Sequence, residues 1–168
     1  MSRAFVKEDG PEPDENPPER PVPPGPNYVT PGGARLLQDE EGRIAAELAA
    51  LAGAQDDAAR RRRKRELERD LRYVRARLEA AIPIDPAALP KDEIRFGARV
   101  SLRRADGEAR VLRIVGEDEA ERGGELVPWS GPFVQALFGL KAGQALDWDA
   151  GAGVERWTVV SVEPSAPV

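Results

Sequence analysis

The chain has 168 residues, a formal net charge of −5, 33% charged and 5% aromatic side chains, and neither cysteine nor histidine. The two missing residue types exclude disulfide bonds, Cys/His zinc sites and nucleophilic mechanisms that need a histidine base. The negative charge argues against broad, non-specific binding to duplex DNA, which depends on neutralising phosphates. No stretch approaches the roughly 18 consecutive apolar residues of a membrane span. The first residues also lack the apolar core of a secretion signal, so we expect a cytoplasmic protein that does not bind membranes.

The N-terminal segment 1–27 contains eight of the sixteen prolines and six acidic residues. Such a segment has too few apolar side chains to offset the entropy cost of ordering. We therefore predict a disordered, partly polyproline-like tail over residues 1–27. It is either a passive solubilising tail or, through Ala4-Phe5-Val6, a docking peptide.

A first helix is predicted after Thr30, which suits an N-cap, and Pro31, which suits the first helical position. Apolar residues then recur at spacings of seven, four and three, which is one face of an amphipathic helix; they are Leu37, Ile44, Leu48 and Leu51. Gly53 suits the end of this helix, and either Asp56 or Asp57 suits the N-cap of the next one.

A second helix is predicted from about Ala58 to Ala81, before Pro83 and Pro86. Its apolar residues alternate at spacings of four, three and four, as in a coiled-coil seam; they are Leu67, Leu71, Val74 and Leu78. Two amphipathic helices joined by a short turn must cover each other's apolar faces. Residues 28–81 are therefore predicted to form an antiparallel helical hairpin.

After a proline-punctuated linker at 82–92, the apolar pattern changes to a period of two. Strands are predicted around Val100–Leu102 and Val111–Val115, joined by the turn at Asp106-Gly107. Further short strands and one helix follow, at 126–129, 132–138, 145–148 and 155–162. Residues 93–165 are thus predicted to form a compact antiparallel β domain with one short helix. Trp148 and Trp157 are predicted to belong to its core. The fold class is α+β.

Three segments of the β domain resemble the C-terminal domain of the bacterial GreA/GreB transcript cleavage factors: Phe96–Val100, Ile114–Ala120 and Pro132–Gly139. Val29–Gly33 resembles the start of that family's coiled coil, and segments between Arg65 and Glu79 resemble the end of its second arm. The resemblance covers roughly residues 28–163 and leaves the proline-rich tail outside.

The resemblance implies an FKBP-like C-terminal domain and a coiled coil that enters the secondary channel of bacterial RNA polymerase. In that family the C-terminal domain docks on the channel rim, and acids at the hairpin tip help to hold the polymerase's second Mg²⁺. The catalytic centre belongs to the polymerase. We therefore expect no enzyme activity and no cofactor of the chain's own, a monomer, and contact with nascent RNA or DNA only inside the polymerase complex.

The sequence departs from the family at the hairpin tip. The family's Glu-Asn pair is absent, and each arm is shorter than a typical one by about two turns, or ~10 Å. Asp56 and Asp57 remain as two adjacent acids. They are either first-turn residues that cap the second helix or ligands that help to hold the polymerase's Mg²⁺.

Two further groups are candidate partner contacts. Arg60, Arg61 and Lys64 belong to the densest charge run of the chain, at 60–65, which is either a solvated helix face paired with nearby acids or a surface for carboxylates and phosphates. The segment Trp129–Pro132, with Ser130 and Gly131 between its ends, corresponds to the family's rim-docking loop. The alternative is an ordinary turn with Pro132 at the first position of a helix.

The resemblance therefore implies a regulator that binds RNA polymerase and modulates transcript cleavage or competes with cleavage factors. A generic coiled-coil adaptor is the alternative of a different class. A peptidyl-prolyl isomerase is suggested only by analogy of fold.

Overall fold

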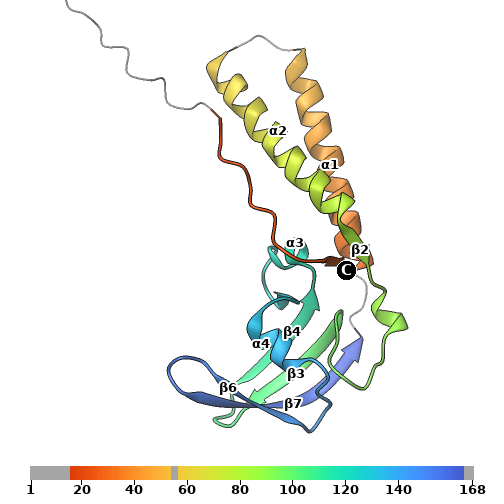
Figure 1. Ribbon diagram of the computed structural model, residues 1–168, viewed down its shortest axis with the longest axis vertical. Helices are drawn as coiled ribbons and strands as arrows, with labels where there is room; N and C mark the ends of the chain where they lie inside the picture. The colour runs from red at the N-terminus through yellow and green to blue at the C-terminus, as the bar shows by residue number, and fades with distance from the viewer. Residues whose placement is uncertain (1–15, 54–56, 165–168) are drawn as a thin grey trace, which may run out of the picture.

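The computed structural model of the protein describes residues 16–53 and 57–164. A helical hairpin projects from one end of a curled β-sheet domain (Figure 1). The N-terminal part consists of β1 (Asn27–Val29), α1 (Pro31–Ala52), α2 (Ala58–Glu79), β2 (Ala81–Pro83) and the 3-10 turn η1 (Pro86–Ala88). The β domain consists of β3 (Ala98–Arg104), β4 (Ala109–Val115), α3 (Glu117–Ala120), β5 (Leu126–Pro128), α4 (Pro132–Leu137), β6 (Ala145–Asp149) and β7 (Val154–Pro164).

Both long helices begin at the residues that the sequence predicts. The Thr30 side chain accepts a hydrogen bond from the Gly33 N–H at 2.9 Å, with Pro31 at the first position of α1. Asp57 caps α2 in the same way. Helix α2 ends at Glu79, two residues before the predicted end, because the chain changes to the strand β2 at Ala81. The predicted α+β hairpin followed by a β domain is confirmed.

The apolar faces of the two helices pack on each other. Leu37 and Ile44 of α1 are buried against Leu67 and Val74 of α2, and the partly buried Leu48, Leu51, Leu71 and Leu78 extend this contact. The seam is therefore the one that the heptad spacing predicts. Within the described ranges, no helix combines the length and the apolar character needed to cross a bilayer.

The β domain is built on a five-stranded sheet in the order β5-β4-β3-β7-β6. Its core surrounds the fully buried Trp157, together with Val100, Leu102, Ile114 and Leu137. Trp148 is half-buried and packs against this core, with its ring 5.4 Å from that of Phe133. Both tryptophans are therefore core residues, as predicted.

The sheet differs from the antiparallel prediction in one strand, because β5 pairs in parallel with β4. A parallel neighbour needs a crossover, and residues 116–125 supply it through α3. The domain therefore contains a second short helix that the sequence analysis did not identify. Its four residues, Glu117–Ala120, are too few to show a helical period.

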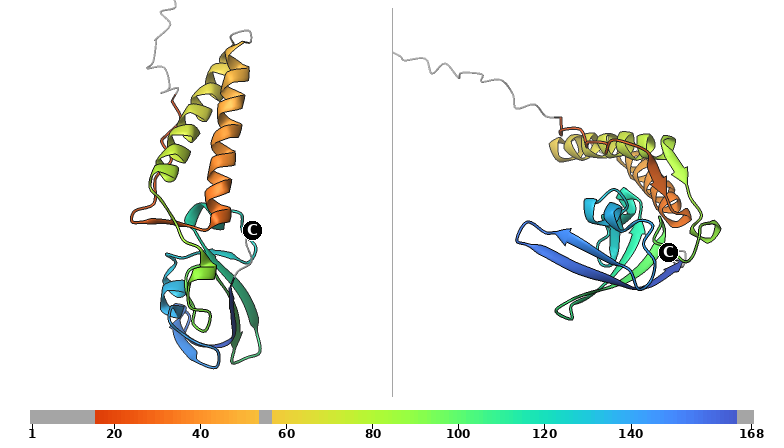
Figure 2. Two further views of the ribbon diagram at one scale, coloured as in Figure 1. Left: turned by 90° about the vertical axis from the view of Figure 1, so that its right-hand side faces the viewer. Right: turned by 60° about the horizontal axis from the view of Figure 1, so that its bottom comes forward.

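The region around the hairpin base also differs from the prediction. Residues 16–26, assigned by composition to a disordered tail, form an extended segment that runs beside α2 (Figures 1 and 2). Asn27–Val29 then pairs in parallel with Ala81–Pro83, across the predicted boundary between the hairpin and the linker. Strands of three residues carry no alternating pattern, so sequence periodicity could not reveal this pairing. The predicted Ala4-Phe5-Val6 docking peptide lies outside the described residues.

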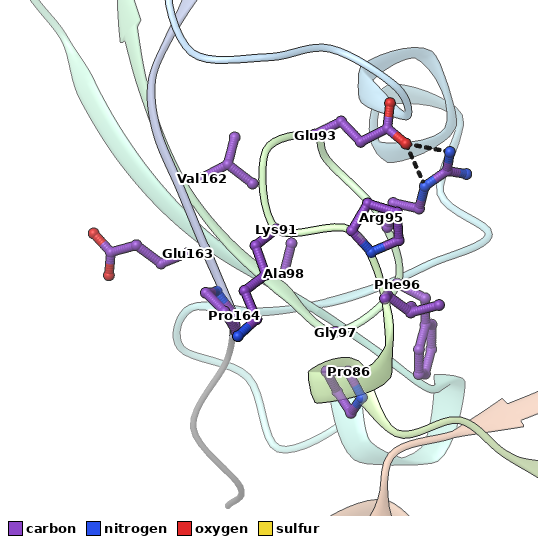
Figure 3. Close-up of a pocket in the computed structure, with 12 residues that line it drawn as sticks. Pro86, Lys91, Glu93, Arg95, Phe96, Gly97, Ala98, Val162, Glu163 and Pro164 are labelled. Carbon is purple, nitrogen blue, oxygen red and sulfur yellow. Dashed lines mark hydrogen bonds and ion pairs between the residues drawn. The ribbon is translucent and has the colours of Figure 1, made fainter.

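The linker is packed closely where η1 meets the start of β3 (Figure 3). Gly97 has a φ of +77°, and a Cβ there would lie 2.4 Å from Cγ of Pro86. The adjoining pocket, between η1 and the end of β7, has a volume of about 10 Å³. That is room for about one water molecule, so this part of the linker is filled by its own side chains.

We predict that Gly97→Ala destabilises the fold more than Gly107→Ala does. Gly107 also has a positive φ, of +96°, but nothing lies within 4 Å of a Cβ placed there. Gly107→Ala should therefore lower the free energy of unfolding by only about 1 kcal/mol, which is the cost of holding an alanine in the left-handed backbone conformation. Gly97→Ala should cost about 1–3 kcal/mol more, because the methyl group overpacks against Pro86. Urea unfolding of both variants measures the difference, and equal losses would contradict the packing explanation.

Candidate functional site

The hairpin tip uses Asp57 as a helix cap. Its carboxylate accepts a hydrogen bond from the Arg60 N–H at 2.8 Å, and its backbone is extended, as an N-cap requires. Asp56, the second candidate acid, lies outside the described residues. Within the described ranges, no group of three or more acidic side chains is arranged to bind a metal ion. The capping interpretation is confirmed for Asp57, and the magnesium interpretation stays a prediction.

The arginine run next to the tip takes part in ion pairs of the hairpin. Arg63 reaches across to Glu47 of α1 with two hydrogen bonds, of 2.7 Å and 3.1 Å. This guanidinium is the main cause that lowers the pKa of the Glu47 carboxyl. Lys64 lies 3.7 Å from Glu68 and keeps 62% of its side chain exposed, so it combines helix pairing with an accessible charge. Of the other two candidates, Arg61 is exposed and Arg60 half-buried.

The loop at Trp129–Pro132 is held by its own hydrogen bonds. The backbone N–H of Gly131 donates to the Pro128 carbonyl at 3.1 Å, and the Gln135 amide donates to the Trp129 carbonyl at 2.7 Å. Pro132 is the first residue of α4, so the turn interpretation is confirmed. Ser130 and Pro132 are exposed, which leaves the docking interpretation as a prediction for these two residues.

Trp129 itself packs inward. The side chain is half-buried, and its ring meets that of Tyr28 edge-on at 5.0 Å. It therefore joins the β domain to the strand β1 at the hairpin base, and its apolar face serves packing within the chain. The ring contact with Tyr28 covers part of this side chain, and a partner contact through Trp129 stays a prediction.

The structure brings together a buried polar cluster at the hairpin base that the sequence analysis missed. Arg77 of α2, only 2% exposed, donates through Nε to the Asp118 carboxylate of α3 at 2.8 Å. It also donates to the side-chain oxygen of Asn27, whose amide donates to the Arg77 carbonyl at 2.7 Å. The Tyr73 hydroxyl donates to the second Asp118 oxygen at 2.7 Å. We call these four residues, Asn27, Tyr73, Arg77 and Asp118, the junction cluster.

Burial and the bond to Asp118 raise the pKa of Tyr73 to about 12. The phenol therefore stays protonated and keeps donating across the physiological pH range. One sequence signal was available: Arg77 lies three and four residues after Val74 and Tyr73, so it falls on the apolar face of α2. An arginine at such a position has to be paired.

A second contact joins α1 to the β domain beside the junction cluster. The Thr30 hydroxyl donates to the Glu119 carboxylate at 2.7 Å, and Glu119 is 3% exposed. A Cβ on Gly33 would lie 2.7 Å from that carboxylate. Glycine is a poor helix former, so Gly33 weakens the first turn of α1. Its missing side chain, however, lets the helix approach α3. The hairpin is fastened to the β domain through both of its arms.

The chain is similar in sequence to known proteins of one family. The family model described as "Transcription elongation factor, GreA/GreB, C-term" matches residues 89–164. The transcription elongation factor GreB of Neisseria meningitidis serogroup A / serotype 4A is 30% identical over 152 residues, covering 82% of this chain and 93% of the relative. GreB of Xanthomonas axonopodis pv. citri is 33% identical over 133 residues, covering 77% and 79%. The chain therefore belongs to the GreA/GreB family of transcription elongation factors.

The chain also resembles solved structures at low sequence identity. The "Prokaryotic transcription elongation factor GreA/GreB from Nitrosomonas europaea" is 22% identical and covers 82% of this chain and 98% of its own, with a TM-score of 0.40. The GreA factor homolog 1 (Gfh1) of Thermus thermophilus is 19% identical and covers 83% and 99%, with a TM-score of 0.37.

We predict that Arg77→Ala is strongly destabilising while Arg75→Ala is nearly neutral. Removing the Arg77 guanidinium leaves Asp118 and Asn27 without their buried partner, which should cost about 3–5 kcal/mol. Arg75 lies two residues away on the same helix and pairs with Glu41 at 2.8 Å, but 61% of its side chain is exposed. Its loss should cost below about 1 kcal/mol. Chemical unfolding measures both, and a mild Arg77→Ala phenotype would mean that the cluster is not needed.

The cap at Asp57 predicts different results for two substitutions. Asp57→Asn keeps a side-chain oxygen that can cap α2, so we expect nearly unchanged stability. Asp57→Ala removes the acceptor for the Arg60 N–H and should cost about 1 kcal/mol. Thermal unfolding with both variants tests the assignment, which fails if alanine and asparagine behave alike.

Proposed function

We propose that the chain binds bacterial RNA polymerase, with its hairpin in the secondary channel and its β domain on the channel rim. In this proposal the chemistry belongs to the polymerase, and the chain brings no catalytic group or cofactor of its own. The observation that carries the proposal is the hairpin itself, which projects from the β domain as a separate arm (Figure 2). Membership of the transcription elongation factor family supports the same partner.

The helical hairpin is a long, rigid arm. Each helix has 22 residues, which at 1.5 Å per residue gives about 33 Å. The helices are joined by their apolar seam and by the Arg63 bridge to Glu47. The junction cluster and the Thr30–Glu119 contact hold the base. A partner that grips the β domain would therefore also determine where the tip lies.

The tip favours a modulator over a full cleavage factor. The Asp57 carboxylate already accepts the Arg60 N–H, and the Glu-Asn pair that the family resemblance calls for is absent from the turn. We therefore propose that the hairpin occupies the channel and limits access of cleavage factors, with little transcript cleavage of its own. Lys64, Arg61 and Arg60 flank the tip and supply positive charge for the carboxylates or phosphates of such a channel.

A competition experiment with purified polymerase and a stalled, backtracked complex tests this proposal. We expect the chain to bind the polymerase and to reduce the transcript shortening stimulated by a GreB protein, with little shortening when it acts alone. The variant Arg61→Ala/Lys64→Ala should bind more weakly and show a smaller dependence on salt. Arg110→Ala, a charge on the β domain paired with Glu108, is the matched control and should bind normally.

Two outcomes would overturn parts of the proposal. No binding to polymerase at any salt concentration would favour the coiled-coil adaptor. Robust transcript shortening that is lost in Asp56→Ala/Asp57→Ala and also in Asp57→Asn would make the chain a cleavage factor that uses its tip carboxylates. The asparagine variant separates the charge from the helix cap, because it keeps the cap.

A further inference from the structure

The extended segment at residues 16–26, which we call the strap, runs beside α2 to the hairpin base. It lies outside the part of the chain that resembles the family. Six of its eleven residues are proline. Proline-rich chains are stiff and extended, so they lose little entropy when they dock along a surface. The strap is continuous with β1, whose Asn27 belongs to the junction cluster.

Arg20 is the residue by which the strap contacts both parts of the molecule. Its guanidinium carbon lies 3.9 Å from the centre of the Tyr73 ring on α2. Its nitrogens lie 4.0 Å from the Asp70 carboxylate on the same helix and 3.7 Å from the Glu121 carboxylate, which follows α3 in the β domain. A single side chain therefore bridges the hairpin and the β domain.

The surroundings of Arg20 have the chemistry of an arginine-binding cleft. Arg20 is one wall of a cavity of about 250 Å³, whose other walls come from α1, α2, α3 and the turn after α3. Leu36, Leu37 and Val74 give it apolar walls. Glu40, Glu121 and the Thr30-bonded Glu119 supply carboxylates, beside one further cation, Arg122. The Tyr73 ring is held in place by its hydroxyl bond to Asp118. A flat ring face with carboxylates beside it suits a guanidinium, which is planar, weakly hydrated and able to stack.

We infer that this cleft is a guanidinium site whose resident ligand is Arg20, and that the docked strap restrains the hairpin against the β domain. Arg20 thus adds to the junction cluster and the Thr30–Glu119 contact, and the range of orientations of the hairpin widens when Arg20 is absent. The N-terminal segment thereby narrows the range of directions in which the hairpin points. This inference concerns the isolated chain and does not depend on polymerase binding.

Spin-label distance measurements on the full chain test the inference directly. The sequence has no cysteine, so labels attach only where cysteine is introduced. Suitable exposed positions are Ala59 near the tip of α2 and Val160 on the sheet, which is 49% exposed. The labelled parent should give a narrow distance distribution. Arg20→Ala should broaden it at least twofold, and Arg20→Lys should broaden it less, because lysine keeps the charge but stacks poorly.

The matched control is Arg62→Ala. Arg62 pairs only along its own helix, with Glu66 at 3.2 Å, and 79% of its side chain is exposed. This variant should keep the distribution of the parent. Glu121→Ala should act like a weaker Arg20→Ala, because it removes the partner in the β domain alone.

A peptide with the sequence of residues 16–26 provides a second, independent readout. Added to the labelled Arg20→Ala chain, it should narrow the distance distribution again, whereas the same peptide with alanine at position 20 should not. Circular dichroism establishes that each variant keeps its helices. If the distribution of the Arg20→Ala chain matches that of the parent, or both peptides act alike, the inference is wrong.

Discussion

The buried ion pair between Arg77 and Asp118 is the contact on which the arrangement of this molecule depends. The buried apolar side chains of the described residues form two clusters, one in the hairpin and one in the β domain. Apolar burial therefore mainly stabilises each part, and ring contacts such as that of Tyr28 with Trp129 add to the polar contacts that orient one part against the other. The Arg77 guanidinium, placed on the buried face of α2, has to be paired because an unpaired buried charge is far too costly. Its partners come from β1 and α3, so satisfying it brings three segments together.

This polar junction explains several features that look unrelated in the sequence. Glycine at position 33 weakens the first helical turn but permits the approach to Glu119. The short helix α3 places Asp118 and Glu119 side by side, one facing each arm of the hairpin. Strand β1 supplies Asn27 to the same cluster. A hairpin fastened at both arms keeps its direction relative to the β domain.

The polar contacts between the hairpin and the β domain also allow their relative orientation to be adjusted. Hydrogen-bonded pairs have defined angles, unlike an apolar interface that tolerates sliding. Arg20 adds a more exposed and therefore more salt-sensitive contact beside the buried ones. The buried junction cluster and the more exposed Arg20 thus hold the same boundary between the hairpin and the β domain with different strengths.

Local patterns in the sequence determined the elements that repeat regularly. The seam of leucines predicted both arms, Thr30 and Asp57 marked the helix starts, and alternation predicted the longer strands, because each signal involves residues close in the chain. The tertiary structure alone decided the rest. Four features join residues that are distant in the sequence. They are the parallel pairing of β1 with β2, the docking of residues 16–26, the inward position of Trp129 and the junction cluster. Their partners are chosen by geometry and by the need to pair buried polar groups, which no local pattern records.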